Sequence, residues 1–195
     1  MTSTSTSSTT STATVGEERQ AQEALKRVAV SLKQSGLRFA LAGGYAAWAH
    51  GAPEPEHDVD FAVARDDAEQ AYAVLENAGL RVVQPPEDWL FKVFTDGTMV
   101  DVTYRINSSP VDSGVLDRAE EMEVLSIVMP VLSATDVLTS KLNALDEHYC
   151  DYSKLLPVAR ALREQVDWDL VRADTAENDF AVAGLFLLDR LGITG

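Results

Sequence analysis

The sequence predicts an α+β fold in which a mixed β-sheet flanked by helices is followed by a C-terminal helical subdomain. Strand-like and helix-like patterns alternate from residue 16 to residue 130, whereas residues 131–195 carry mainly helical patterns. The 195 residues are 46% hydrophobic, which is enough apolar side chain for a real core. We therefore expect a sheet-containing domain at 16–130 and a helical subdomain at 131–195.

The first residues are expected to form a disordered tail, assigned to 1–15. Residues 1–14 are almost entirely Ser and Thr, and such a segment cannot bury enough apolar area to offset its ordering entropy. From residue 17 to 36 the apolar positions recur at helical spacing, and Gly36 ends the pattern. This segment is expected to be a helix that packs on the sheet.

The sheet domain is expected to alternate short strands with helices. The sequence predicts strands at 38–42, 58–64 and 80–83, and helices at 45–50 and 66–78. Residues 89–94 and 99–106 alternate apolar and polar side chains around Asp96-Gly97, which indicates a hairpin. A loop at 107–114, a short helix at 115–119 and a strand at 122–129 complete this half.

The helical subdomain is expected to begin at Ser133. Ser133 is a plausible helix N-cap with Asp136 three residues on, an arrangement like a capping box. The predicted helices span 133–147, 151–164 and 177–191, with a short helical turn at 167–171.

Three carboxylates form the candidate site. Asp58 and Asp60 project from one face of a predicted strand, with Cα atoms about 6.5–7 Å apart. Two unpaired carboxylates repel each other, and a hard divalent cation removes that problem. Asp101 lies in the later strand and either completes a two-metal site or takes the proton of an acceptor hydroxyl. We predict Mg²⁺, with Mn²⁺ as an alternative, on Asp58, Asp60 and Asp101.

Gly43 and Gly44 lie between a strand-like run and a helix-like one. Without Cβ atoms the backbone can approach phosphate groups closely, and the following helix offers free N–H groups. Each feature also has an ordinary explanation when it is taken alone. The glycine pair suits a strand-to-helix turn, Asp58 and Asp60 suit a solvated strand face, and Asp101 suits an outward position on a hairpin. Their order along the chain favours catalysis or nucleotide binding.

The segment Ala42-Gly-Gly…His57-Asp-Val-Asp-Phe, with Val100-Asp-Val downstream, resembles the nucleotidyltransferase superfamily of the polymerase-β type. Among its small bacterial stand-alone members, the chain resembles the AbiEii-like toxin group, and it is also similar to the aminoglycoside and lincosamide nucleotidyltransferases. A weaker likeness to the toxin group lies in the helical pattern from Lys141 to Asp151.

The resemblance implies metal at Asp58 and Asp60, a third acid at Asp101, and phosphate contacts from Gly43 and Gly44. Lys141 is assigned to the triphosphate, where it supplies positive charge to catalysis and nucleotide binding. A nucleotide base needs an aromatic partner, and the candidates are Tyr45, Trp48 and Tyr104. Lys92, on the predicted hairpin, is interpreted as a solvated strand lysine or a phosphate contact.

The leading function is a magnesium-dependent transfer of a nucleoside monophosphate from an NTP, such as ATP, to an acceptor hydroxyl. A toxin-like enzyme that modifies RNA at the tRNA 3′ end, paired with a cognate antitoxin, is the first interpretation. The alternatives are an aminoglycoside-type enzyme that modifies a cationic small molecule, and a catalytically silent homologue that binds or regulates.

The turn before Asp58 departs from the family pattern. Glu54 and Glu56 stand in the region where these families often carry a basic phosphate contact. They favour a cationic acceptor, an extra metal or a degenerate enzyme. His57 is interpreted as a surface histidine, with a proton shuttle or a phosphate contact as the alternative.

The charge limits the range of partners. With 31 acidic and 16 basic residues the net charge is −15, which opposes long-range attraction to nucleic acid and anionic membranes. A local basic patch remains available for RNA. No apolar run reaches the length of a membrane span, no signal-peptide pattern opens the chain, and Cys150 is the single cysteine. We expect a cytoplasmic protein without a membrane partner.

Overall fold

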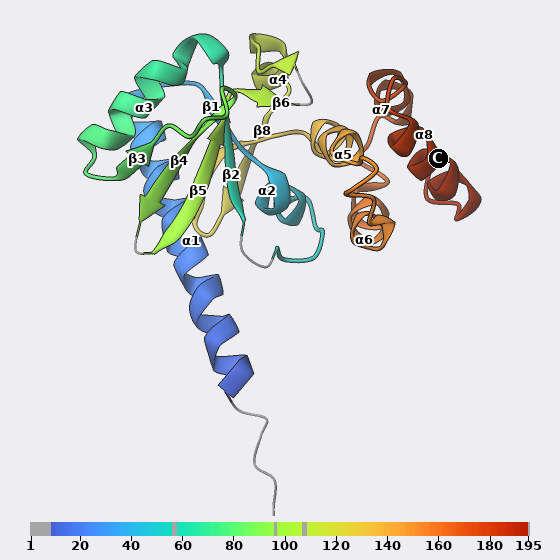
Figure 1. Cartoon of the computed structure of the whole chain (residues 1–195), viewed down its shortest axis with the longest axis horizontal. Helices are drawn as coiled ribbons and strands as arrows, with labels where there is room; N and C mark the ends of the chain where they lie inside the picture. Colours follow the sequence, from blue (N-terminus) through green and yellow to red (C-terminus); the bar gives the residue numbers. More distant parts are fainter. Residues whose placement is uncertain (1–8, 56–57, 96, 107–108, 195) are drawn as a thin grey trace, which may run out of the picture.

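The computed structural model of the chain describes residues 9–55, 58–95, 97–106 and 109–194 (Figure 1). Within these ranges, a seven-stranded mixed sheet has the order β3-β4-β5-β2-β1-β9-β8, beside a two-stranded sheet of β6 and β7. The strands are β1 (Phe39–Ala42), β2 (Val59–Val63), β3 (Arg81–Val83), β4 (Leu90–Thr95), β5 (Thr98–Thr103), β6 (Arg105–Ile106), β7 (Ser109–Pro110), β8 (Glu120–Val124) and β9 (Ile127–Val131). The helices are α1 (Thr9–Ser35), α2 (Gly43–Ala49), the 3-10 helix η1 (Arg65–Asp67), α3 (Ala68–Asn77), α4 (Ser113–Asp117), α5 (Ala134–Asn143), α6 (Tyr152–Leu162), α7 (Trp168–Asp174) and α8 (Asp179–Arg190).

The sheet mixes parallel and antiparallel pairs, as the sequence predicts. β2 runs antiparallel to β1 and parallel to β5, while β9 runs parallel to β1 and antiparallel to β8. β4 pairs antiparallel with both β5 and β3. The two neighbouring strands at the centre, β2 and β5, therefore point the same way, and residues of equal register face the same side of the sheet.

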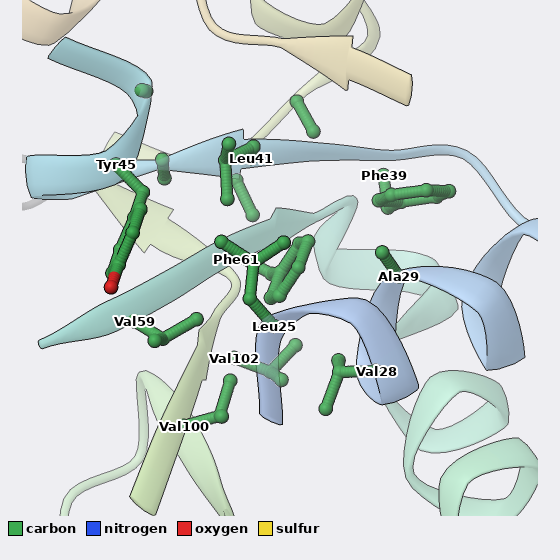
Figure 2. Close-up of a cluster of buried hydrophobic side chains, with 14 of the residues drawn as sticks. Leu25, Val28, Ala29, Phe39, Leu41, Tyr45, Val59, Phe61, Val100 and Val102 are labelled. Atoms are coloured by element: carbon green, nitrogen blue, oxygen red, sulfur yellow. The ribbon is translucent and has the colours of Figure 1, made fainter. Parts of the chain in front are cut away.

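A large part of the main core lies between α1 and one face of the sheet (Figure 2). Leu25 and Val28 of α1 are fully buried against strand residues such as Phe61 and Val102. Because side chains alternate along a strand, burying Val59 and Phe61 on this face directs Asp60 to the opposite face. α2 and α5 lie on that opposite side (Figure 1).

A second apolar cluster joins helices α5 to α8. Its members are Leu138, Leu142, Leu155, Ala159, Val171, Ala181, Leu185, Leu188 and Ile193. Helix α5 contributes to both clusters, because Ala134 and Val137 belong to the main core. The boundary predicted between residues 130 and 131 thus lies near the end of β9, three residues before α5, the helix shared by the two clusters. The division into two domains stays a prediction.

His50 connects α2 to the helical half. Its Nε2 lies 2.8 Å from the carbonyl oxygen of Leu132, and its Nδ1 lies 3.1 Å from Oε1 of Gln165. Gln165 returns a hydrogen bond from its Nε2 to the carbonyl of His50 at 3.0 Å. These contacts fix the end of α2 against the segments that precede α5 and follow α6.

The hairpin of β8 and β9 differs from the single strand predicted at 122–129. Leu125 and Ser126 form its turn with φ of +51° and +66°. Tight hairpin turns with two positive φ angles usually carry Asn-Gly or Asp-Gly, so the pair Leu125-Ser126 does not predict a turn. β6 lies at the end of the strand predicted at 99–106, whereas its partner β7 falls where a loop was predicted.

Helix α1 begins at Thr9, eight residues before its predicted start, so residues 9–15 are helical rather than part of the expected tail. Once the buried part of the helix has formed, adding further turns avoids the cost of nucleation. Residues 1–8 of the predicted tail lie outside the described residues. No helix in the described part of the chain is long and apolar enough to cross a membrane.

Candidate functional site

Two carboxylates and a lysine form a row across the centre of the sheet. Asp60 of β2 is in register with Asp101 of β5, and Asp101 is in register with Lys92 of β4. Nζ of Lys92 lies 3.1 Å from Oδ1 of Asp101, and both side chains are 27% exposed. Asp101 therefore has a carboxylate neighbour on one strand and an ammonium partner on the other.

Asp58 extends the row toward solvent. It immediately precedes β2 and is exposed, whereas Val59 is buried and Asp60 is partly buried. The alternation places Asp58 and Asp60 on one face, as predicted from the sequence. The structure thus brings all three predicted carboxylates to the same end of β2 and β5.

The glycine pair makes room for this arrangement. Gly43 has a φ of +59°, and a Cβ there would lie 2.7 Å from Cγ of Asp60. A Cβ on Gly44 would lie 2.7 Å from Cβ of Pro55, in the turn that leads to Asp58. The backbone N–H of Gly44 donates a hydrogen bond to the Asp60 carboxylate. Gly43 is therefore required by the packing of the β1–α2 turn on Asp60, and Gly44 by its close approach to Pro55. Their contact with phosphate stays a prediction.

The pKa of Asp60 is raised from its ordinary value of 3.8 to about 6. Burial is the main cause, and the negative charges of Asp101 and Asp58 act in the same direction. The charge of Lys141 and the hydrogen bond from Gly44 oppose the rise. This concentration of negative charge is what a bound cation would relieve.

Lys141, in the last turn of α5, faces these carboxylates. Burial lowers the pKa of Lys141, whereas the charges of Asp60 and Asp58 raise it. Its Nζ lies within 4.0 Å of no carboxylate among the described residues, which leaves the ammonium available to another anion. The placement of Lys141 beside Asp58 and Asp60 agrees with the sequence prediction; its role remains a prediction.

Two hollows meet at Asp58. One, of about 450 Å³, lies between Asp58, Lys141 and the start of α6, and it is lined by Asp58, Lys141, Ala144, Leu145, Tyr149, Asp151, Lys154 and Leu155. The other, of about 340 Å³, lies between α1 and the β4–β5 turn, and it is lined by Glu17, Gln20, Ala21, Asp58, Gly97, Thr98 and Met99. The charged lining residues of the first are Lys141 and Lys154 with Asp58 and Asp151, whereas those of the second are, among the described residues, Glu17 and Asp58. We call them the lysine pocket and the acidic pocket.

The wall of the lysine pocket is built by the loop between α5 and α6. Asp146 accepts hydrogen bonds from the backbone N–H groups of His148 and Tyr149, both at 2.7 Å. Asp151 caps α6 by accepting from the N–H of Ser153 at 3.0 Å. The loop presents Tyr149 at the rim of the pocket with 79% of its surface exposed.

The aromatic residues expected to contact a base lie elsewhere. Tyr45 has no exposed surface and belongs to the main core (Figure 2). Its ring meets that of Trp48 edge-on, with the ring centroids 5.9 Å apart. Its pKa is raised, first by burial and then by the charges of Glu54 and Glu18. Tyr104 is also buried. The expected nucleotide contact of Tyr45 is therefore not possible in this structure, because the apolar side chains of the core enclose the ring.

The acidic turn before Asp58 is only partly described. Glu54 accepts a hydrogen bond from Nε2 of Gln22 on α1 at 2.7 Å, which joins the turn to that helix. Glu56 and His57, for which the sequence offered several interpretations, lie outside the described residues, as does Asp96 of the predicted hairpin turn.

The described carboxylates suit a hard cation only in part. No three His, Cys, Asp or Glu side chains within the described ranges converge closely enough to hold a metal ion by themselves. The expected three-carboxylate metal site is not preformed, since Asp101 is paired with Lys92. Asp58 and Asp60 still fit Mg²⁺, which commonly uses one or two carboxylates and completes its shell with water and substrate phosphates. The crowded, raised-pKa carboxylate of Asp60 favours such a cation.

The contacts of two residues at this site could not be predicted from the sequence. Lys92 was interpreted only as a solvated strand lysine or a phosphate contact. The alternation of the strand places it on the same face as Phe94, but the register that pairs it with Asp101 is not visible in the sequence. Tyr149 gave no signal, because its position depends on how the α5–α6 loop folds.

The comparisons with known proteins agree with this geometry. A family model described as uncharacterised nucleotidyltransferase matches residues 8–189. No curated protein sequence matches the chain. The crystal structure of ANT(2")-Ia in complex with adenylyl-2"-tobramycin is similar, with a TM-score of 0.60 and 13% identity over 80% of this chain and 94% of that one.

Two further solved structures are similar to this chain. The solution structure of the same antibiotic-resistance factor gives a TM-score of 0.61 and 13% identity over 89% of this chain and 98% of that one. An antigenic nucleotidyltransferase-like protein from Paracoccidioides brasiliensis gives 0.51 and 12%, over 86% and 92% of the two chains. At these identities the likeness shows the fold, and it confirms the predicted fold class.

Proposed function

The chain belongs to this nucleotidyltransferase family, and from that premise we propose that it transfers a nucleoside monophosphate from a metal-bound NTP to a hydroxyl group of an acceptor. In this reaction the acceptor oxygen forms a bond to the α-phosphorus, and the bond from that phosphorus to the bridging oxygen breaks. Pyrophosphate leaves, and the proton of the hydroxyl passes to a carboxylate of the enzyme. We place the reaction in the cytoplasm.

The observation that carries the proposal is the position of Lys141 opposite Asp58 and Asp60. An anion that binds there together with a divalent cation would meet one positive side chain and two carboxylates whose charges the cation offsets. A magnesium-bound triphosphate has this chemistry. When bound, the cation neutralises the charge that develops on the phosphate oxygens.

Each residue of the site then has a distinct task. Asp58 and Asp60 hold the cation, and the N–H of Gly44 keeps the Asp60 carboxylate in place. Lys141 attracts the triphosphate. Asp101, next to Asp60 on the neighbouring strand, takes the proton of the acceptor or contributes to metal binding.

The lysine pocket suits the nucleotide. Its volume of about 450 Å³ is in the range of small-molecule sites, and it opens from Asp58 toward Lys141 and Lys154. Leu145, Leu155 and the ring of Tyr149 provide apolar surface against which a base can pack. Of the three aromatic residues that the sequence suggested for this contact, Tyr45 and Tyr104 are buried and Trp48 packs against the main core.

For the acceptor, we infer a cationic small molecule that carries a hydroxyl group. The acidic pocket shares Asp58 with the lysine pocket, Lys141 is not part of its lining, and Glu17 lies in its wall. A net charge of −15 also attracts a cation and repels a polyanion. This acceptor was the second interpretation of the sequence, and the acidic pocket is the observation that now favours it.

The second candidate for the acceptor is an RNA 3′ end, which was the first interpretation of the sequence. Lys154 stands with Lys141 in the lysine pocket, and the helical pattern from Lys141 to Asp151 resembles the toxin-like group. An enzyme of that kind would be accompanied by an antitoxin.

A labelling assay tests the function and separates the acceptors. The purified protein is incubated with each α-³²P-labelled NTP and Mg²⁺ or Mn²⁺, with total RNA in one tube and a panel of aminoglycosides in another. Label in an aminoglycoside supports the cationic acceptor, and label in RNA supports the toxin-like enzyme. Asp58→Ala is the control and should transfer no label. NTP binding without transfer in either tube would favour a silent homologue, and the absence of NTP binding would contradict the proposal.

A further inference from the structure

We propose that Lys92 is a positioning residue that holds Asp101 away from the metal, so that the site binds one divalent cation, at Asp58 and Asp60. Asp101 is then left as the carboxylate that receives the acceptor's proton. This inference rests on the proposed function and goes beyond it, because it assigns the number of cations and gives Lys92 a task.

The first support is the register of three adjacent strands. Asp60, Asp101 and Lys92 are consecutive partners across β2, β5 and β4. Partners on neighbouring strands have Cα atoms about 5 Å apart, and their side chains lie on the same face. Asp101 is therefore centred between a carboxylate and an ammonium group, and it pairs with the ammonium.

The second support is that the pair is built into the sheet. Both side chains are 27% exposed, and Nζ of Lys92 also lies 3.4 Å from Sδ of Met99. By contrast, the Arg38–Asp117 pair exposes 49% and 67% of its side chains, and the Lys26–Glu23 pair exposes 34% and 61%. Shielding from water strengthens the Lys92–Asp101 attraction relative to those surface pairs.

The third support is the effect of Lys92 on a second cation. A cation bridging Asp60 and Asp101 would lie next to the Lys92 ammonium, and like charges repel at that distance. A cation on Asp58 and Asp60 is one strand farther from Lys92. In agreement with this, no three carboxylate, His or Cys side chains within the described ranges gather into a metal-binding group.

Counting bound Mn²⁺ tests the inference without any reaction. Mn²⁺ alone is titrated into the protein, and the free ion is measured by its electron paramagnetic resonance signal. Wild type and Lys92→Arg, which keeps the positive charge, should each bind one Mn²⁺ per chain. Lys92→Met removes the charge beside two neighbouring carboxylates and should bind two. Lys26→Met removes the lysine of another carboxylate pair, on α1, and should still bind one.

Two Mn²⁺ ions in wild type, one in Lys92→Met, or none in wild type would each overturn the inference. Circular dichroism confirms that every variant is folded, and Lys92→Gln replaces Lys92→Met if the latter is not. The labelling assay separates this failure from that of the proposed function: a wild-type protein that transfers label but binds two Mn²⁺ refutes only the role of Lys92. A protein that neither binds Mn²⁺ nor transfers label refutes both.

Discussion

Gly43 and Asp60 compete for one volume: a Cβ on Gly43 would lie 2.7 Å from Cγ of Asp60, so the carboxylate fills the space that any other side chain would need. The same glycine has a φ of +59°, which L side chains rarely adopt. The strand-to-helix turn and the candidate metal ligand are therefore a single packing unit. Changing either should affect both.

Gly43→Ala should lose stability and activity together. The left-handed backbone costs an Ala about 1–2 kcal/mol, and displacement of Asp60 by about 1 Å can lower kcat/KM by about 100-fold. Gly192→Ala is the matched control, because Gly192 has a φ of +63° but nothing within 4 Å of a Cβ. It should show the loss in Tm alone. Thermal melts and label-transfer rates check this, and equal activity losses in the two variants would contradict the relationship.

The metal-free protein should become less stable as the pH rises from about 4 to about 7. The folded state raises the pKa of Asp60 from 3.8 to about 6, so it favours the protonated carboxyl. The stability from this group is fully present below pH 4 and is lost as the pH rises through 6. Asp60→Asn cannot ionise, so its free energy of unfolding should exceed that of wild type at pH 7 by an amount on the order of 2–3 kcal/mol.

Urea unfolding at several pH values, in the presence of a chelator, measures this difference. Adding Mg²⁺ at pH 7.5 should stabilise wild type and leave Asp60→Asn unchanged, because only wild type has both carboxylates. A difference between the two proteins that is independent of pH would show that Asp60 titrates normally.

Lys141→Met should lower the catalytic efficiency of the enzyme with its NTP substrate. The ammonium is partly buried and faces Asp58 and Asp60, so its removal takes away a positive charge that a triphosphate would meet out of bulk water. We expect kcat/KM for the NTP to fall by about 100-fold, the size of effect seen when a charged or hydrogen-bonding partner of the transition state is removed. Steady-state kinetics check this. Lys26→Met, a lysine paired with Glu23 on α1, is the control and should have wild-type kinetics.

Tyr149→Ala should raise KM for the NTP by about tenfold, the effect of losing one base–aromatic contact. Tyr149 is 79% exposed at the rim of the lysine pocket, so Tm should not change. Tyr149→Phe keeps the ring and should keep the KM. Phe186→Ala removes a ring that is 67% exposed on α8, outside the lining of the lysine pocket, and should have no effect on KM. An unchanged KM in Tyr149→Ala would remove this residue from the nucleotide site.

Much of the site follows from local rules. The alternation of a strand predicts that Asp58 and Asp60 share a face while Val59 is buried, and the structure agrees. A glycine pair between a strand and a helix predicts a close approach, which proves to be to Asp60. The spacing of apolar residues also predicted most of the helices, because each helix buries one apolar face.

The remaining features depend on contacts distant in sequence. Nothing local reveals that β2 and β5 are parallel partners, and this pairing decides that Asp101 meets both Asp60 and Lys92. Tyr45 was one of three aromatic candidates for a contact with the base, but the side chains of the main core enclose it. The Leu125-Ser126 turn breaks the usual residue preference, so the β8–β9 hairpin was predicted as one strand.

The most direct test of the central claim follows both ends of the nucleotide in one reaction. The protein, Mg²⁺ and the acceptor identified by the labelling assay are supplied with either α- or γ-³²P-labelled NTP, and the products are separated. The α label should enter the acceptor while an equal amount of γ label appears as pyrophosphate, and Asp60→Asn should abolish both. Transfer of the γ label to the acceptor, or its release as free phosphate without pyrophosphate, would contradict nucleotidyl transfer at Asp58 and Asp60.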